Sequence, residues 1–96
     1  MSKLIRDNYE SIIDTDRMYI AEDISEKFIF LKDKIYEELE ELSETAFNDI
    51  EEYADVIEVI YAMAEFQGIY RDEIETARIN KLKKRGGFKK WLILKE

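Results

Sequence analysis

The sequence contains no cysteine and no histidine among its 96 residues. These absences exclude disulfide bonds, thiolate nucleophiles, zinc sites built on nitrogen or sulfur ligands, and catalytic arrangements of the Ser-His-Asp or Cys-His type. Any chemistry that the chain performs must therefore use carboxylates, lysine, arginine, hydroxyl groups and a bound ion.

Proline is also absent and glycine occurs only three times, so little in the chain breaks a helix. A content of 40% charged residues is typical of a helical protein. The chain has no basic and then apolar leader and no run of about 18 apolar residues, so we expect neither secretion nor a membrane span. We expect one all-α domain over residues 1–96, located in the cytoplasm.

The charge balance is strongly acidic, with 23 acidic and 15 basic residues and a formal net charge of −8. Nucleic acids and anionic membranes both repel an acidic protein, so we expect the chain to bind neither of them broadly. A chain of this length buries only part of its surface when it folds alone. A partner subunit would therefore help it to fold.

Apolar side chains recur at helical spacing between residues 22 and 43. They step by four or three positions and so form one stripe along a helix, namely Ile24, Phe28, Leu31, Ile35, Leu39 and Leu42. Asp23 or Ser25 is suited to cap the start of this helix.

A second helix is predicted from about residue 49 to residue 67. Its first turns are acidic, but residues 53–66 are apolar on nearly every side. A helix that is apolar all round must be buried all round, and one other long helix cannot cover it. We therefore expect two chains to pair and to place these helices in a shared four-helix core.

A third helix is predicted from residue 70 to residue 84, after Gly68, which suits the position just beyond a helix C-cap. Its acids lie in its first turns and its lysines in its last, an order that complements the helix dipole. Residues 3–13 have the apolar spacing of a short helix packed on the main body. Residues 89–94 are compatible with a short terminal strand that could pair with residues 17–20, giving a terminal β ribbon.

Two acidic groups stand out, the run from Glu37 to Glu41 and a second group at Glu52, Asp55 and Glu58. Positions three apart share a helix face, so each segment would present paired carboxylates. Asp55 and Glu58 lie among apolar residues, where an unpaired charge is costly and a nearby cation is needed. The alternatives are a solvated acidic face and ion pairs to lysine or arginine.

Oxygen ligands from two facing helices favour magnesium or manganese, which also accept phosphate oxygens as ligands. Such an ion suits phosphoryl chemistry, because it neutralises phosphate charge and can lower the pKa of an attacking water. Basic residues would then hold the phosphates, although surface solubility alone also explains each of them. The candidates are Lys3, Arg6, Lys34, Lys81, Lys84 and Arg85.

The two acidic groups resemble a known signature. Glu37-Glu38-x-x-Glu41 followed by Glu52-x-x-Asp55 is similar to the EExxE…ExxD pattern of the MazG-like all-α nucleoside triphosphate pyrophosphohydrolases. The letters KLIRD at residues 3–7, Lys34 ahead of the first motif and RGGF at residues 85–88 are similar to one branch of this superfamily, often labelled phosphoribosyl-ATP pyrophosphohydrolase-like. The chain departs from the branch at residues 8–9 and in the short gap between the acidic motifs.

The resemblance implies a MazG-like bundle and hydrolysis of a nucleoside triphosphate between its α and β phosphates, with the removal of non-canonical nucleotides, or house-cleaning, as one role for it. By the family's pattern the magnesium ligands would be Glu38, Glu41, Glu52 and Asp55. Glu37 and Glu58 would assist in the ligand shell or in water activation, and Glu37 or Glu38 would orient or deprotonate the water. Lys81, Lys84 and Arg85 would hold the leaving pyrophosphate.

Two other hypotheses remain open. One is phosphoribosyl-ATP pyrophosphohydrolase of histidine synthesis, which shares the acidic motifs and the bond cleaved. The other is a non-catalytic helical interaction module whose acids form a solvated face. For the enzyme we expect a homodimer or a dimer of dimers, a nucleotide substrate and a magnesium cofactor, with manganese as an alternative.

Overall fold

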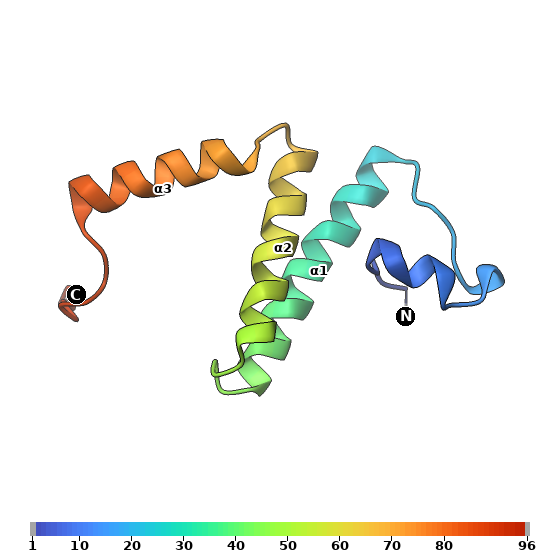
Figure 1. Cartoon of the computed structure of the whole chain (residues 1–96), viewed down its shortest axis with the longest axis horizontal. Helices are drawn as coiled ribbons and strands as arrows, with labels where there is room; N and C mark the ends of the chain where they lie inside the picture. The colour runs from blue at the N-terminus through green and yellow to red at the C-terminus, as the bar shows by residue number, and fades with distance from the viewer. Residues whose placement is uncertain (1, 96) are drawn as a thin grey trace.

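The computed structural model describes residues 2–95 and is all-helical over that range, which confirms the predicted all-α class. Two short 3-10 helices precede three α-helices (Figure 1). The elements in chain order are the 3-10 helices Asp7–Ser11 and Thr15–Arg17, then α1 (Ile24–Glu44), α2 (Ile50–Phe66) and α3 (Arg71–Arg85). None of the helices in residues 2–95 has both the length and the apolar character needed to cross a membrane.

The ends of the long helices agree with the sequence interpretation. Asp23 caps α1 by accepting a hydrogen bond at Oδ2 from the backbone N–H of Glu26, over 3.1 Å. Asp49 caps α2 in the same way through the N–H of Glu51, over 2.9 Å. Gly68 has a φ of 82° and follows Gln67, the C-cap residue of α2, as predicted for a residue beyond a C-cap.

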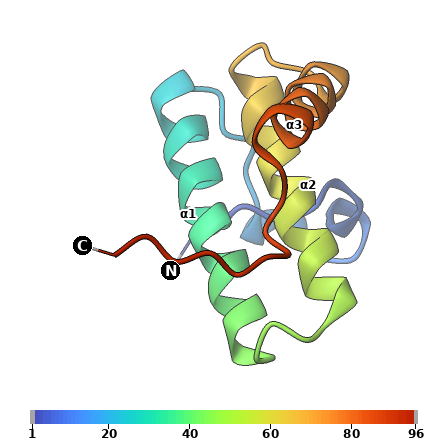
Figure 2. The same ribbon diagram turned by 90° about the vertical axis from the view of Figure 1, so that its left-hand side faces the viewer.

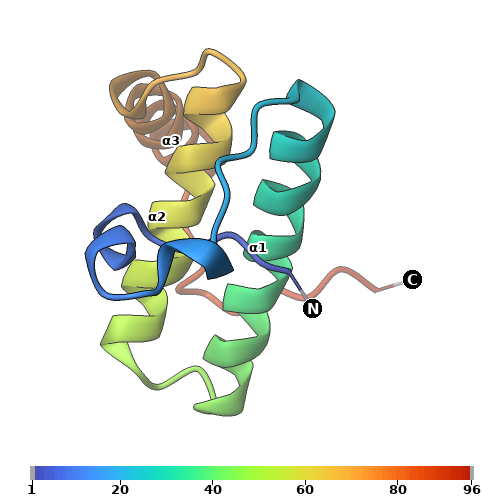
Figure 3. The same ribbon diagram turned by 90° about the vertical axis from the view of Figure 1, so that its right-hand side faces the viewer.

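Helices α1 and α2 form an antiparallel hairpin, and α3 extends away from it (Figure 1). Figures 2 and 3 view the hairpin from opposite sides. The N-terminal segment lies on one side, and α3 with the C-terminal segment lies on the other. The molecule is accordingly elongated, measuring 52 × 31 × 27 Å.

The hydrophobic core within one chain is small. Among residues 2–95, Leu31 and Leu42 are the buried apolar residues, and both lie on α1. One side of α2 exposes apolar side chains at helical spacing, namely Ile50, Tyr53, Ile57 and Ile60. One chain therefore covers α2 only in part and buries none of its residues, short of the all-round burial that its composition requires.

The predicted terminal β ribbon is wrong, because no strand occurs in residues 2–95. Residues 17–20 and 89–94 lie toward opposite ends of the molecule, since α3 carries the C-terminal segment away from the N-terminal one (Figure 1). The helix predicted for residues 3–13 is shorter than expected and is a 3-10 helix, Asp7–Ser11. On α3, which extends away from the hairpin, Leu82 is 48% exposed.

Candidate functional site

The N-terminal segment lies across one face of the α1–α2 hairpin (Figure 3). The segment and the hairpin together line a groove of about 910 Å³. One wall comes from residues 3–13, and the other comes from α1 and α2. The charged residues of this lining are Lys3, Arg6, Asp7, Lys34, Glu37, Glu38, Glu41, Asp55 and Glu58. Most of the candidate site residues that the sequence indicates therefore lie in one groove.

Two sets of three carboxylates meet beside this groove. Glu37, Glu38 and Glu41 of α1 form one set, and Glu38 forms the other with Glu52 and Asp55 of α2. Within each set, one carboxylate oxygen from each residue lies within 4.8 Å of the others. The hairpin thus brings the two acidic motifs together, with Glu38 belonging to both sets.

Glu38 is the most buried of these acids, with its side chain only 8% exposed. Its Oε1 lies 3.2 Å from Nζ of Lys34, but its buried Oε2 has no hydrogen-bond donor within residues 2–95. Oε2 of Glu52 is also buried and also has no hydrogen-bond donor within residues 2–95. A buried carboxylate oxygen without a partner is costly, so both atoms indicate a place for a cation.

Lys34 is the cation that lies closest to the Glu37–Glu38 pair. Its Nζ lies 3.3 Å from Glu37 Oε2 and 3.2 Å from Glu38 Oε1, and its side chain is 14% exposed. Burial alone would lower the pKa of Lys34, but the hydrogen bonds and negative charges of the two glutamates outweigh burial and raise it. Lys34 therefore stays protonated in the groove.

The N-terminal segment supplies two more cations to the same acids. Arg6 donates from Nη2 to Oδ1 of Asp55 over 2.5 Å, and Lys3 Nζ lies 3.6 Å from Oε1 of Glu37. Both basic side chains are more than half exposed, so each contact is weaker than a buried ion pair. These contacts hold the segment over the acids without satisfying the two buried oxygens.

Hydrogen bonding, burial and repulsion among the acids together shift two of their pKa values. A side-chain hydrogen bond with Glu38, formed when one carboxyl of the two holds a proton, raises the pKa of Glu41, and burial and the charges of Glu38, Glu37 and Glu52 raise it further. Burial, then the charges of Asp55 and Glu38, raise the pKa of Glu52. A divalent cation would relieve this repulsion.

Other candidate residues lie outside the two carboxylate sets. Glu58 lines the groove, but its Oε2 pairs with Nη2 of Arg71 over 3.1 Å. The sequence interpretation missed Arg71, whose guanidinium also lies 4.6 Å from the ring centre of Tyr61. Lys81, Lys84 and Arg85 lie at the far end of α3, on the opposite side of the hairpin from the N-terminal segment (Figures 1 and 2).

Comparison of the chain with protein-family models, with curated proteins and with solved structures gives no match. A functional proposal therefore depends on the groove and its chemistry.

The raised pKa values make stability depend on pH. The folded chain binds protons at Glu41 and Glu52 more tightly than the unfolded chain does, so their ionisation lowers the free energy of unfolding above the folded pKa. This loss is recovered as pH falls through the folded pKa. We expect the double variant Glu41→Gln, Glu52→Gln to have a higher free energy of unfolding than the wild type at pH 7. The difference between the two should shrink toward pH 4. Urea unfolding without divalent ions measures it.

Glu40→Gln is the matched control, because Glu40 is exposed on the same helix and belongs to neither carboxylate set. Its effect on stability should stay near zero across the pH range. A margin for the double variant that is constant from pH 7 to pH 4 would contradict the repulsion described above.

Proposed function

We propose that the chain is a magnesium-dependent nucleoside triphosphate pyrophosphohydrolase that releases a nucleoside monophosphate and pyrophosphate. One observation carries the proposal: the buried Glu38 belongs to two carboxylate sets and has an oxygen without a donor in the described chain. Cations from the N-terminal segment and from Lys34 line the same groove, which suits a substrate with several phosphates.

The residues fit a hard divalent cation. All the donors are carboxylate oxygens from two packed helices, which is the ligand type that magnesium and manganese prefer. Glu38, Glu41, Glu52 and Asp55 would hold the ion. When bound, it supplies neutralisation of the phosphate charge and a lower pKa for an attacking water.

Glu37 is the better of the two candidates for orienting and deprotonating the water. Its side chain is 27% exposed against 8% for Glu38, so water can reach it. Glu38 is also committed to Lys34 through Oε1. The water would attack the α-phosphorus, its proton would pass to Glu37, and the bond from that phosphorus to the bridging oxygen of the leaving pyrophosphate would break.

Arg6 and Lys3 would change partners during binding. Each occupies an acid of the site, Asp55 and Glu37 respectively, and each is more than half exposed, so it can turn to a phosphate oxygen at small cost. Lys34 is less mobile and would hold its place beside Glu37 and Glu38. In this proposal the basic end of α3 contributes only if a second chain brings it to the groove.

A homodimer follows from the exposed stripe of α2. Ile57 is 51% exposed and Ile50 is 81% exposed, and apolar rows of this length are usually covered in a stable protein. Pairing two hairpins through this stripe would complete the four-helix core of a MazG-like bundle. The acidic groove lies along the opposite side of α2 and would stay open, because residues 52, 55 and 58 occupy a different helix face from the stripe.

The activity is tested with a panel of ribo- and deoxynucleoside triphosphates and phosphoribosyl-ATP in magnesium, with pyrophosphate and monophosphate as the readouts. We expect turnover of at least one triphosphate and its loss in Glu38→Gln and in Asp55→Asn. Calorimetric titration should show magnesium affinity reduced by more than about tenfold in each, the low end of what is lost when a supporting residue of a metal site is removed.

Glu40→Gln should retain both activity and magnesium affinity, because Glu40 is an exposed acid outside the carboxylate sets. Turnover of phosphoribosyl-ATP alone would assign the enzyme to histidine synthesis. If the wild type binds no magnesium and cleaves nothing in the panel, the acids form a solvated face and the chain is an interaction module.

Arg6→Gln separates metal binding from substrate binding. Removing the guanidinium frees Asp55 from its 2.5 Å contact, so the affinity for magnesium should rise severalfold. The KM for the triphosphate should rise as well, because a phosphate ligand is lost. Calorimetry and steady-state kinetics measure the two effects, and weaker magnesium binding in this variant would contradict the competition.

The dimer is tested by light scattering. We expect twice the 11.5 kDa mass of one chain for the wild type and a shift toward one chain for Ile57→Glu, which places a charge in the stripe. Ile12→Glu is the control, since Ile12 is 74% exposed on the N-terminal segment and away from the stripe. A wild type with the mass of a single chain would rule out the shared core.

A further inference from the structure

The last ten described residues before the C-terminus, 86–95, form an exposed segment after α3 that we call the C-terminal arm. Its large apolar side chains are 84–94% exposed, namely Phe88, Trp91, Leu92, Ile93 and Leu94. Contiguous apolar exposure of this kind marks an interaction surface. The arm lies on the opposite side of the hairpin from the N-terminal segment (Figures 2 and 3). It is therefore separate from the acidic groove, which that segment lines.

The C-terminal arm and the end of α3 differ in charge from the rest of the chain. Residues 81–95 hold seven basic residues and no acidic one, whereas residues 1–80 hold 22 acidic and eight basic residues. Opposite charges attract and set the orientation of a complex. The acidic body of a second copy of this chain therefore complements the arm in charge.

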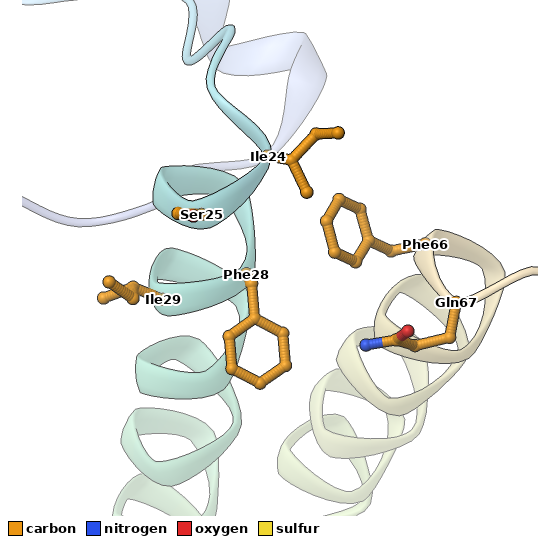
Figure 4. A pocket seen from close by; sticks show the side chains of 6 residues that line it. All are labelled: Ile24, Ser25, Phe28, Ile29, Phe66 and Gln67. Carbon is orange, nitrogen blue, oxygen red and sulfur yellow. The ribbon is translucent and has the colours of Figure 1, made fainter.

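That body has an apolar pocket at the open end of the α1–α2 hairpin, with a volume of about 460 Å³ (Figure 4). Ile24 and Phe66 point toward one another across it, and the ring of Phe28 points toward α2. The pocket can hold one large aromatic side chain. Gln67 at its rim has a side-chain amide whose oxygen could accept a hydrogen bond from an indole N–H.

Acidic residues stand next to this pocket in the chain. Glu22, Asp23 and Glu26 adjoin Ile24 at the start of α1, and Glu65 precedes Phe66 at the end of α2. The arm has the complementary order, because Lys89 and Lys90 directly precede Trp91. An aromatic side chain preceded by two lysines thus matches an apolar pocket whose neighbours in sequence include four acids and one base, Lys27.

A second copy of the chain is the occupant that the geometry favours. Helix α3 has 15 residues, roughly 22 Å of rigid helix at 1.5 Å per residue, and it leads the arm away from the pocket of its own chain (Figure 1). Two copies related by a two-fold axis can exchange arms, each filling the pocket of the other.

We propose that the C-terminal arm docks on a second copy of this chain, with Trp91 in the pocket formed by Ile24, Phe28 and Phe66. Lys89 and Lys90 would then lie toward the acids that adjoin these residues in sequence. The contact uses residues separate from the α2 stripe and from the groove. It therefore stands whether or not the proposed enzymatic activity is correct.

Trp91 is the single tryptophan of the chain, so its fluorescence reports directly on the arm. We expect blue-shifted emission, as for a buried indole, at concentrations where the protein self-associates, and a red shift on dilution or in high salt. Ile24→Lys should cause the same red shift without dilution. The substitution is mild for folding because Ile24 is 73% exposed, and Ile12→Lys, at a residue 74% exposed elsewhere, is the matched control with unchanged emission.

A mixing experiment shows whether docking occurs between chains. Trp91→Phe provides an intact pocket with no fluorescent reporter, and Ile24→Lys provides the reporter with a damaged pocket. After subunit exchange the mixture should regain the blue shift that Ile24→Lys lacks alone. No change on mixing would overturn docking between chains. Solvent-exposed emission of the wild type at every concentration, or a shift that appears only with anionic lipid vesicles, would overturn the proposal as well.

Discussion

The charge of Glu38 has to be balanced inside the protein, and much of the surrounding structure depends on how this is done. Its carboxylate is buried beside four other acids, and only one of its oxygens meets a cation, Lys34. Breaking a buried pair of this kind is costly, because the surviving charge cannot be hydrated. The Lys34–Glu38 contact therefore fixes one oxygen of this carboxylate, and the second oxygen, which has no partner within residues 2–95, could accept a further cation.

The acids beside Glu38 also explain the position of the N-terminal segment. Residues 3–13 include only the short 3-10 helix Asp7–Ser11 and no buried residue. Apolar packing therefore contributes little to holding this segment on the hairpin. Arg6 and Lys3 reach Asp55 and Glu37 from this segment. Electrostatic attraction to an acidic surface thus closes one side of the groove, and a ligand that competes for those acids can loosen it.

The parts of the fold that follow from local sequence were predictable. The apolar spacing of a helix, its N-cap and the glycine beyond its C-cap are signals that lie within one or two turns of chain. These signals predicted the ends of α1 and α2 closely. The proximity of Glu38 to Asp55 also followed, because two helices joined by a short turn must pack side by side. The prediction of a terminal β ribbon was wrong because strand pairing depends on the direction in which α3 carries the chain, and no local pattern in the sequence encodes that direction. Arg71 was missed for a related reason, since its contact with Glu58 spans the turn between α2 and α3.

Helix α2 carries acidic residues on one face and exposed apolar residues on the other, and these two faces affect stability in opposite directions. The face with Glu52 and Asp55 gathers charge that destabilises the ion-free chain, as the raised pKa of Glu52 shows. The face with Ile50, Ile57 and Ile60 offers apolar area that is still exposed in one chain. Covering that face would contribute about 25 cal/mol for each Å² of apolar surface removed from water, a gain that can offset the repulsion on the other face. Covering the apolar face of α2 would therefore add stability to a chain whose own core is small. A cation bound at the acidic face would reduce the repulsion there.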